Sequence, residues 1–186
     1  MPSGRTHDSI TLWSLPIVAG GAFVLTQSGN LTLIVSGAFL VSGLMFGPDL
    51  DIYSQQYKRW GLLRWIWLPY RKSMCHRSFL SHGLIVGTIG RILYLAIWIA
   101  IVSGSIILGG AIAQQLLGII NHWQTPAQHG FMNSIGVVKQ SLQHHGNEWI
   151  AGTIGLELGA ISHSASDWIV STYKRMKKRR KKRAKG

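Results

Sequence analysis

Carboxylates and histidines occur together in this chain, although acidic residues are scarce. The sequence contains only six Asp and Glu residues, against eight His. Three of the acids lie beside or within two helical turns of a histidine, in otherwise apolar surroundings: Asp8, Glu157 and Asp167. Two more, Asp49 and Asp51, follow the uncharged run 31–46. Carboxylate oxygens and imidazole nitrogens are ligands of divalent cations, and a carboxylate in an apolar helix is costly unless a cation or a donor compensates it. The pattern is typical of a metal site.

Local spacing supports this interpretation. His163 and Asp167 stand at positions i and i+4, so a helix projects both from one face, as two ligands of one ion require. Asp49 and Asp51 directly follow Pro48, and in a loop both carboxylates could turn inward. The sequence therefore predicts ligands from at least two separate segments.

Cysteine chemistry is excluded by composition. Cys75 is the only cysteine, so neither an intrachain disulfide, a thiolate zinc knuckle nor a CxxC pair can form. Any metal must use nitrogen and oxygen ligands, and we expect one or two divalent ions, zinc or manganese.

The elements that must position these residues are membrane helices. The chain is 47% hydrophobic, and the runs 31–46 and 92–120 carry no charge. The first apolar stretch continues into a second without a convincing cleavage site, so it is not a signal peptide. We expect an all-α integral membrane bundle of about four spans: 9–26, 31–47, a third beginning near Phe79, and 148–172.

Charge sets the orientation of this bundle. The net charge of +13 is concentrated in 58–77 and in the tail 173–186, and basic segments stay cytoplasmic. Both termini are therefore expected in the cytoplasm, with 121–148 as a polar external loop of a single membrane domain, 1–172. The segment 53–72 mixes Trp, Tyr and basic residues as an interfacial amphipathic helix does. Anionic lipid headgroups are the expected partners of the basic segments, and nucleic acid is not.

The third element is too long for one simple span. A single helix over 80–120 would measure roughly 60 Å, twice the ~30 Å hydrocarbon core. It must extend beyond the bilayer, bend or break, and Gly104 and Gly109-Gly110 are the predicted places.

This topology brings the candidate ligands to one layer. They precede the first span, follow the second, open the third and occupy the last turns of the fourth, and all of these places are cytoplasmic ends. Helical bundles build metal centres from facing side chains in this way. The predicted ligands are His7, Asp8, Asp49, Asp51, His76, His82, His163 and Asp167.

Four segments also resemble a known family. They are PSGRTHD (2–8), SGLMFGPDLDIYS (42–54), HRSFLSHG (76–83) and ELGAISHSASDW (157–168). They resemble a bacterial family of uncharacterised metal-binding membrane proteins, similar in motif order to the YdjM-like membrane-bound metal-dependent hydrolases, which share a PDxD, an HR-to-SH segment and an HxxxD. The resemblance implies a metal site at Asp49, Asp51, His76, His82, His163 and Asp167, with His7 and Asp8 added for the closer family. It also implies a hydrolase in a bacterial inner (or thylakoid) membrane.

Structural roles compete with several of these assignments. Asp8 could be a helix N-cap, Asp49 and Asp51 a solvated turn, and His163 with Asp167 a hydrogen-bonded pair. His76 could bind lipid headgroups at the interface.

Glu157 and two arginines have open roles. Glu157 lies six residues before His163, so it belongs to another face or layer. It could be a second metal ligand, a partner of an imidazole, a general base, or a structural partner of Arg91. Arg77 and Arg91 could instead contact a substrate phosphate.

Two functions follow from the predicted site. The first is a membrane-embedded metal-dependent hydrolase acting on a phosphoester or ester of a lipid or other amphiphile, with Glu157 as its base. The alternative is a non-enzymatic membrane protein whose structural metal clamps the helix ends together.

Overall fold

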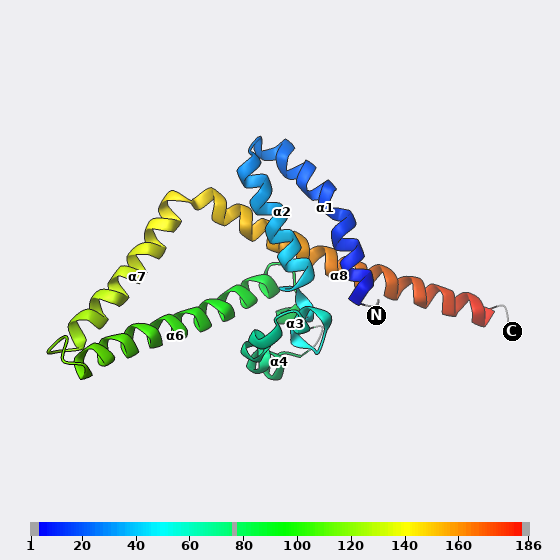
Figure 1. Ribbon diagram of the computed structural model, residues 1–186. Helices are drawn as coiled ribbons and strands as arrows, with labels where there is room; N and C mark the ends of the chain where they lie inside the picture. Colours follow the sequence, from blue (N-terminus) through cyan, green and yellow to red (C-terminus); the bar gives the residue numbers. More distant parts are fainter. Residues whose placement is uncertain (1–3, 76–77, 184–186) are drawn as a thin grey trace. The chain divides into compact units, whose positions relative to one another are not determined.

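All the regular structure of the described chain is helical, as the sequence predicts. The computed structural model describes residues 4–75 and 78–183, without the side chains of Arg5, Leu80, His82, Lys174 and 178–183. Its helices are α1 (Gly4–Thr26), α2 (Gly29–Leu44), η1 (Pro48–Asp51), α3 (Gln55–Lys58), η2 (Gly61–Trp67), α4 (Leu68–Ser73), α5 (Phe79–His82), α6 (Val86–Leu116), α7 (Gln124–His144) and α8 (Gly146–Arg183) (Figure 1). The chain falls into two compact units, Met1–Arg91 with Ile150–Gly186, and Ile92–Trp149.

Three of these helical stretches are long and apolar enough to cross a membrane. They are Thr6–Thr26, Gly29–Asp51 and Val86–Leu116. Many of their large apolar side chains face outward, such as Trp13 at 82% exposure, which suits a lipid environment better than water. α8 is more polar, because Glu157, His163 and Asp167 interrupt its apolar residues. The fourth span therefore stays a prediction.

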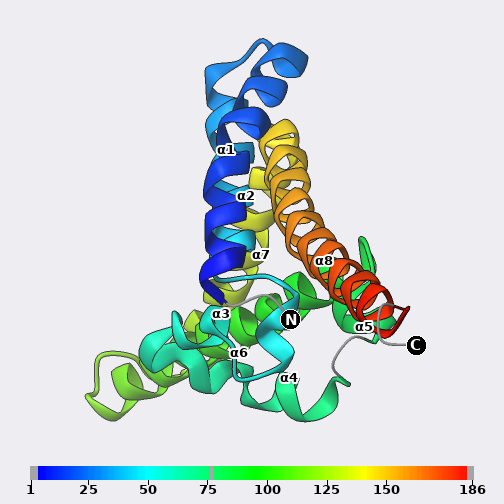
Figure 2. The ribbon, with the colours of Figure 1, turned by 90° about the vertical axis from the view of Figure 1, so that its right-hand side faces the viewer.

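In the first unit, α1 and α2 form an antiparallel hairpin against which α8 packs (Figures 1 and 2). Ser28 ends the short connection, and its hydroxyl accepts a hydrogen bond from the backbone of Leu31 as a helix N-cap. Two glycines of α8 permit its close approach to α2. A Cβ on Gly155 would lie 2.3 Å from the carbonyl oxygen of Val35, and one on Gly159 would lie 2.6 Å from that of Phe39. This is a GxxxG contact, in which small residues let two helix backbones meet.

The segment after α2 folds around an aromatic core. The Trp67 ring is fully buried and meets Phe46, Trp60 and Tyr70 edge-on, with ring centroids 5.1–5.6 Å apart. An interfacial amphipathic segment was expected over 53–72, and the chain forms there the short pieces α3, η2 and α4 rather than one continuous helix. This small core fixes η1 and α3 against the end of α2.

The second unit corrects two expectations. α6 is unbroken through Gly104 and Gly109-Gly110, and at 31 residues it is about 46 Å long. Gly104 makes room instead for the Phe131 ring of α7, which lies 3.4 Å from the position its Cβ would take. The break comes earlier, at Ile85, whose φ of +65° separates α5 from α6.

The polar segment 121–148, expected as a loop, contains α7 instead. Polarity was mistaken for irregular structure. The segment has few helix breakers, and Pro126 stands in the first turn of α7, where its missing N–H has no helical partner to lose. The basic tail likewise continues α8 as far as Arg183.

Candidate metal centre

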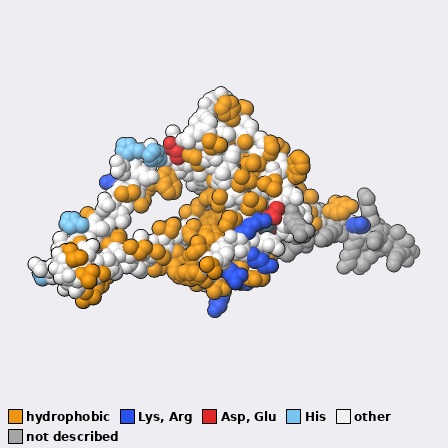
Figure 3. Space-filling model, viewed as in Figure 1, with side chains coloured by type: hydrophobic (Ala, Val, Ile, Leu, Met, Phe, Trp, Pro, Cys, Tyr) orange, Lys and Arg blue, Asp and Glu red, His pale blue; other side chains and the backbone are white. Residues whose placement is uncertain are grey.

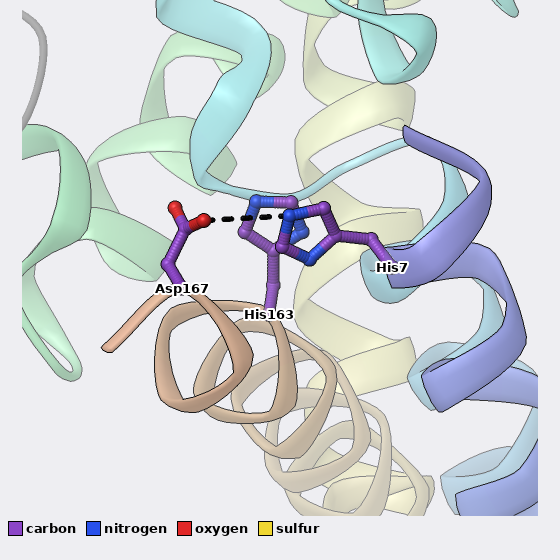
Figure 4. A group of neighbouring side chains, drawn as sticks. All are labelled: His7, His163 and Asp167. Atoms are coloured by element: carbon purple, nitrogen blue, oxygen red, sulfur yellow. Dashed lines mark ion pairs between the residues drawn. The ribbon is translucent and has the colours of Figure 1, made fainter. Parts of the chain in front are cut away.

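Two histidines and an aspartate converge inside the first unit, from helices that are distant in sequence. His7 comes from the first turns of α1, and His163 and Asp167 come from α8. Each offers one ligand atom, and these atoms all lie within 4.8 Å of one another. Figure 4 shows the two imidazoles over α8, with Asp167 facing them. The rings stack, with centroids 3.9 Å apart and planes 18° from parallel.

Asp49 joins this group from η1. Its Oδ2 lies 3.2 Å from Nε2 of His163, and His7 Nε2 lies 3.4 Å from Oδ1 of Asp167. Pro48 opens the short 3-10 turn that carries Asp49, and the hydroxyl of Ser54 donates a hydrogen bond to the Asp49 carbonyl. Three elements therefore meet at the cluster of His7, Asp49, His163 and Asp167, named here the HD cluster.

The cluster is buried, and three polar atoms of His163 and Asp167 have no hydrogen-bond partner. His7, His163 and Asp167 are 6%, 3% and 8% exposed. Both carboxylate oxygens of Asp167 and Nε2 of His163 are shielded from solvent without a hydrogen-bond partner. Buried polar groups are normally hydrogen-bonded, and a buried carboxylate is costly unless it is paired or binds a cation. The residues therefore fit a divalent ion held by nitrogen and oxygen donors.

A second layer of side chains holds the imidazoles in place. The Ser166 hydroxyl lies 2.7 Å from His7 Nδ1 and donates a 2.7 Å hydrogen bond to the carbonyl of His163. The amide of Gln56 donates to the carbonyl of Gly43 at 2.9 Å and lies 3.4 Å from Nδ1 of His163. Such partners orient metal-binding histidines and select the nitrogen that faces the ion.

The cluster opens onto a cavity of about 230 Å³. Its wall combines the HD cluster with polar and aromatic side chains of the segment 52–58, among them Tyr53, Gln56 and Lys58. A metal bound by the cluster would face space for a further ligand.

Asp8 lines the cavity but has another partner. Arg59 donates two hydrogen bonds to the Asp8 carboxylate, at 2.9 and 2.5 Å, and a third to the carbonyl of Leu44 at 2.8 Å. The bond to Asp8 raises the pKa of Arg59 above its usual value. This ion pair ties α1 to the end of α2, and the assignment of Asp8 as a metal ligand stays a prediction.

Asp51, Arg91 and Glu157 lie in a separate group. Arg91 is 1% exposed and donates hydrogen bonds to the carbonyl of Ser81 and the hydroxyl of Thr88, both at 3.0 Å. Glu157 Oε1 accepts a 2.8 Å hydrogen bond from the backbone of Ile85. Asp51 is buried as well, and none of the three lines the cavity of the HD cluster. These contacts hold the turn between α5 and α6, and they do not bring Glu157 or Arg91 to the cavity.

The remaining predictions lie outside the description. His76 and Arg77 are not among the described residues, and neither is the side chain of His82. Sequence reasoning missed Ser166, Gln56, Lys58 and Arg59. Ser166, three residues after His163 and directly before Asp167, could have been found as a polar side chain on the same helix. Nothing in the sequence pattern singled out Gln56.

The membrane-length helices and the buried His/Asp cluster define a class, that of helical metal-binding proteins. Residues 2–177 match the family model described as "Uncharacterized metal-binding protein (DUF2227)", and the chain belongs to that family. No curated protein and no solved structure matches the chain. The predicted relationship to the YdjM-like hydrolases stays a prediction.

Proposed function

We propose that this protein is a membrane-embedded metal-dependent hydrolase that uses the HD cluster. The observation that carries the proposal is the cavity of about 230 Å³ beside the buried ligands. A purely structural metal site is closed by its protein ligands, whereas a catalytic site keeps an open position for substrate.

The side chains have distinct roles in the proposed site. His7, His163 and Asp167 hold one or two divalent ions, zinc or manganese, and Asp49 beside His163 is placed to complete the set. Such an ion supplies Lewis-acid polarisation of the scissile group. Ser166 and Gln56 keep the two imidazoles oriented.

Membrane location suggests the substrate. Three helical stretches can span a bilayer, and the first two place His7 and Asp49 at the same end of the α1–α2 hairpin. With the basic segments on the cytoplasmic side of a bacterial inner (or thylakoid) membrane, this end meets the cytoplasmic interface. The substrate is then a phosphoester or ester of a lipid or other amphiphile.

Metal content and hydrolysis measured together test the proposal. Detergent-purified protein should bind zinc or manganese stoichiometrically, and Asp167→Asn should lose it because an amide is a weaker ligand. Glu148→Gln is the matched control, since it removes a carboxylate from the same helix outside the cluster. The parent and Glu148→Gln should hydrolyse members of a phosphoester and ester panel, and Asp167→Asn should not. An inactive, fully metallated parent would contradict the enzyme proposal.

A structural clamp is the second candidate, and the burial of the cluster favours it. The ligands come from α1, η1 and α8, so an ion would join three elements whether or not it did chemistry. Protein at a free metal concentration 100 times the Kd is stabilised by about 2.7 kcal/mol, and removal of the metal by a chelator should lower the free energy of unfolding by that amount. Asp167→Asn should show no chelator effect. If the metal is only a clamp, the protein loses stability on chelation but shows no hydrolase activity before or after it.

A further inference from the structure

Basic and aromatic side chains line the cavity of the HD cluster. Lys58 and Tyr53 line the same cavity as His163 and Asp167. The Lys58 ammonium lies 4.9 Å from the centroid of the Tyr53 ring, and the Arg71 guanidinium lies 5.6 Å from the same centroid. Cations within about 6 Å of an aromatic ring are attracted to its face. The Tyr53 ring thus attracts the Lys58 ammonium beside the cavity.

Lys58 is also a surplus positive charge. Asp8 of this cavity is already paired with Arg59. In the described chain no carboxylate forms an ion pair with Lys58, and Asp49 and Asp167 each face a histidine. A divalent ion in the cluster would be balanced by these two carboxylates. The cavity would then keep the positive charge of Lys58, which attracts an anion.

We propose that Lys58, held by Tyr53, binds a phosphate group in this cavity. Lysine is a point-charge ligand for phosphate. A phosphoester is anionic before it reacts, so the positive charge of Lys58 increases its binding affinity. A carboxylic ester is neutral at its scissile group and has no such charge for Lys58 to attract. The conclusion that the substrate is a phosphoester rests on the proposed function and narrows its substrate class. The conclusion that the cavity binds phosphate rests only on the cavity itself.

Binding of inorganic phosphate to metal-loaded, detergent-purified protein tests the site. Lys58→Met should weaken phosphate affinity about tenfold or more, since a hydrogen bond to a charged group contributes ~1.5–3 kcal/mol and 1.4 kcal/mol is tenfold. Lys58→Arg should retain most of the affinity. Lys139→Met removes an exposed lysine of α7 and should bind phosphate as the parent does. Titration calorimetry gives the affinities, and elemental analysis should show equal metal content in all four proteins.

The outcomes separate this inference from the proposed function. Equal phosphate affinity in the parent and Lys58→Met, or no phosphate binding by the metallated parent, overturns the inference while the hydrolase proposal can survive. Phosphate binding that depends on Lys58 in a protein that hydrolyses no phosphoester supports the inference and counts against the hydrolase.

A soluble short-chain phosphatidic acid, titrated in the same assay, distinguishes a lipid source from free phosphate. Tighter Lys58-dependent binding of the lipid identifies a headgroup, and tighter binding of inorganic phosphate identifies a soluble anion. Both results support a phosphate site. Lipid binding that is unchanged in Lys58→Met contradicts it.

Discussion

The Ser166 hydroxyl lies 2.7 Å from Nδ1 of His7 and has already given its proton to the carbonyl of His163. A hydroxyl has one proton to donate, so Ser166 accepts from His7, and Nδ1 is the protonated ring nitrogen. The lone pair of His7 is then on Nε2, which faces Asp167. Ser166 thus selects the tautomer of His7 whose Nε2 can bind a metal ion.

Ser166→Ala should weaken metal affinity without removing a ligand. Loss of such a partner typically costs about 10- to 100-fold in affinity, because the ring is no longer held in one orientation. Competition with a chromophoric chelator measures the change. Ser164→Ala, on the same helix but outside these hydrogen bonds, should retain parent affinity, and equal affinities in all three proteins would refute the positioning role.

Glu157→Gln decides between a structural and a catalytic carboxylate. Glutamine keeps the oxygen that accepts the backbone N–H of Ile85, so folding and hydrolysis should both remain near parent values. A general base would lose its function on this change, with a loss of about 10²–10⁴-fold in kcat. Activity assays beside a thermal melt distinguish the two, and a folded but inactive variant would restore the catalytic role predicted from the sequence.

Gly159→Ala should disturb the contact between α8 and α2. Its Cβ would lie 2.6 Å from the Phe39 carbonyl oxygen, so the helices must separate, at a cost of about 1–3 kcal/mol. Gly152→Ala is the control on the same helix, because its Cβ would meet only Ile34 at 3.8 Å. Denaturant unfolding in detergent should show a lower free energy of unfolding for Gly159→Ala alone. Equal stability would mean that the close approach is not required.

Asp8→Asn should leave metal content unchanged. Asp8 is committed to Arg59, and a partly exposed ion pair contributes about 0.2–1 kcal/mol, so only a small loss of stability is expected. Elemental analysis checks the first expectation and a thermal melt the second. Loss of metal in this variant would confirm Asp8 as the metal ligand that the sequence predicts.

The sequence predicted the helical class and much of the cluster for definite reasons. Spacing of four residues on a helix is geometric, so His163 and Asp167 share a face wherever α8 lies. The hairpin of two apolar helices brings His7 and the segment after α2 to one end. Asp51 could not be placed in this way. In the 3-10 turn η1 three residues complete a turn, so positions two apart face different sides, and Asp49 reaches His163 while Asp51 does not join it.

Other features were beyond a pattern in the sequence. Gln56 reaches His163 only because the aromatic core around Trp67 folds α3 back onto α2, a packing result without a local signal. α7 was missed because polar residues predict a loop and a solvated helix equally well. Gly155 and Gly159 form a GxxxG pattern in the sequence, but the pattern does not predict that α2 is the helix that packs against them.

The separation of the ligands along the chain has a consequence for biosynthesis. His7 lies in α1 and Asp167 in α8, so the ribosome makes His7 well before Asp167, and the cluster needs both. The α1–α2 hairpin is therefore made with an incomplete cluster, and metal binding by the full cluster would have to wait for translation of α8. Metal binding would then be a late step of assembly. A chain truncated before α8 would lack His163 and Asp167 and could not form the cluster.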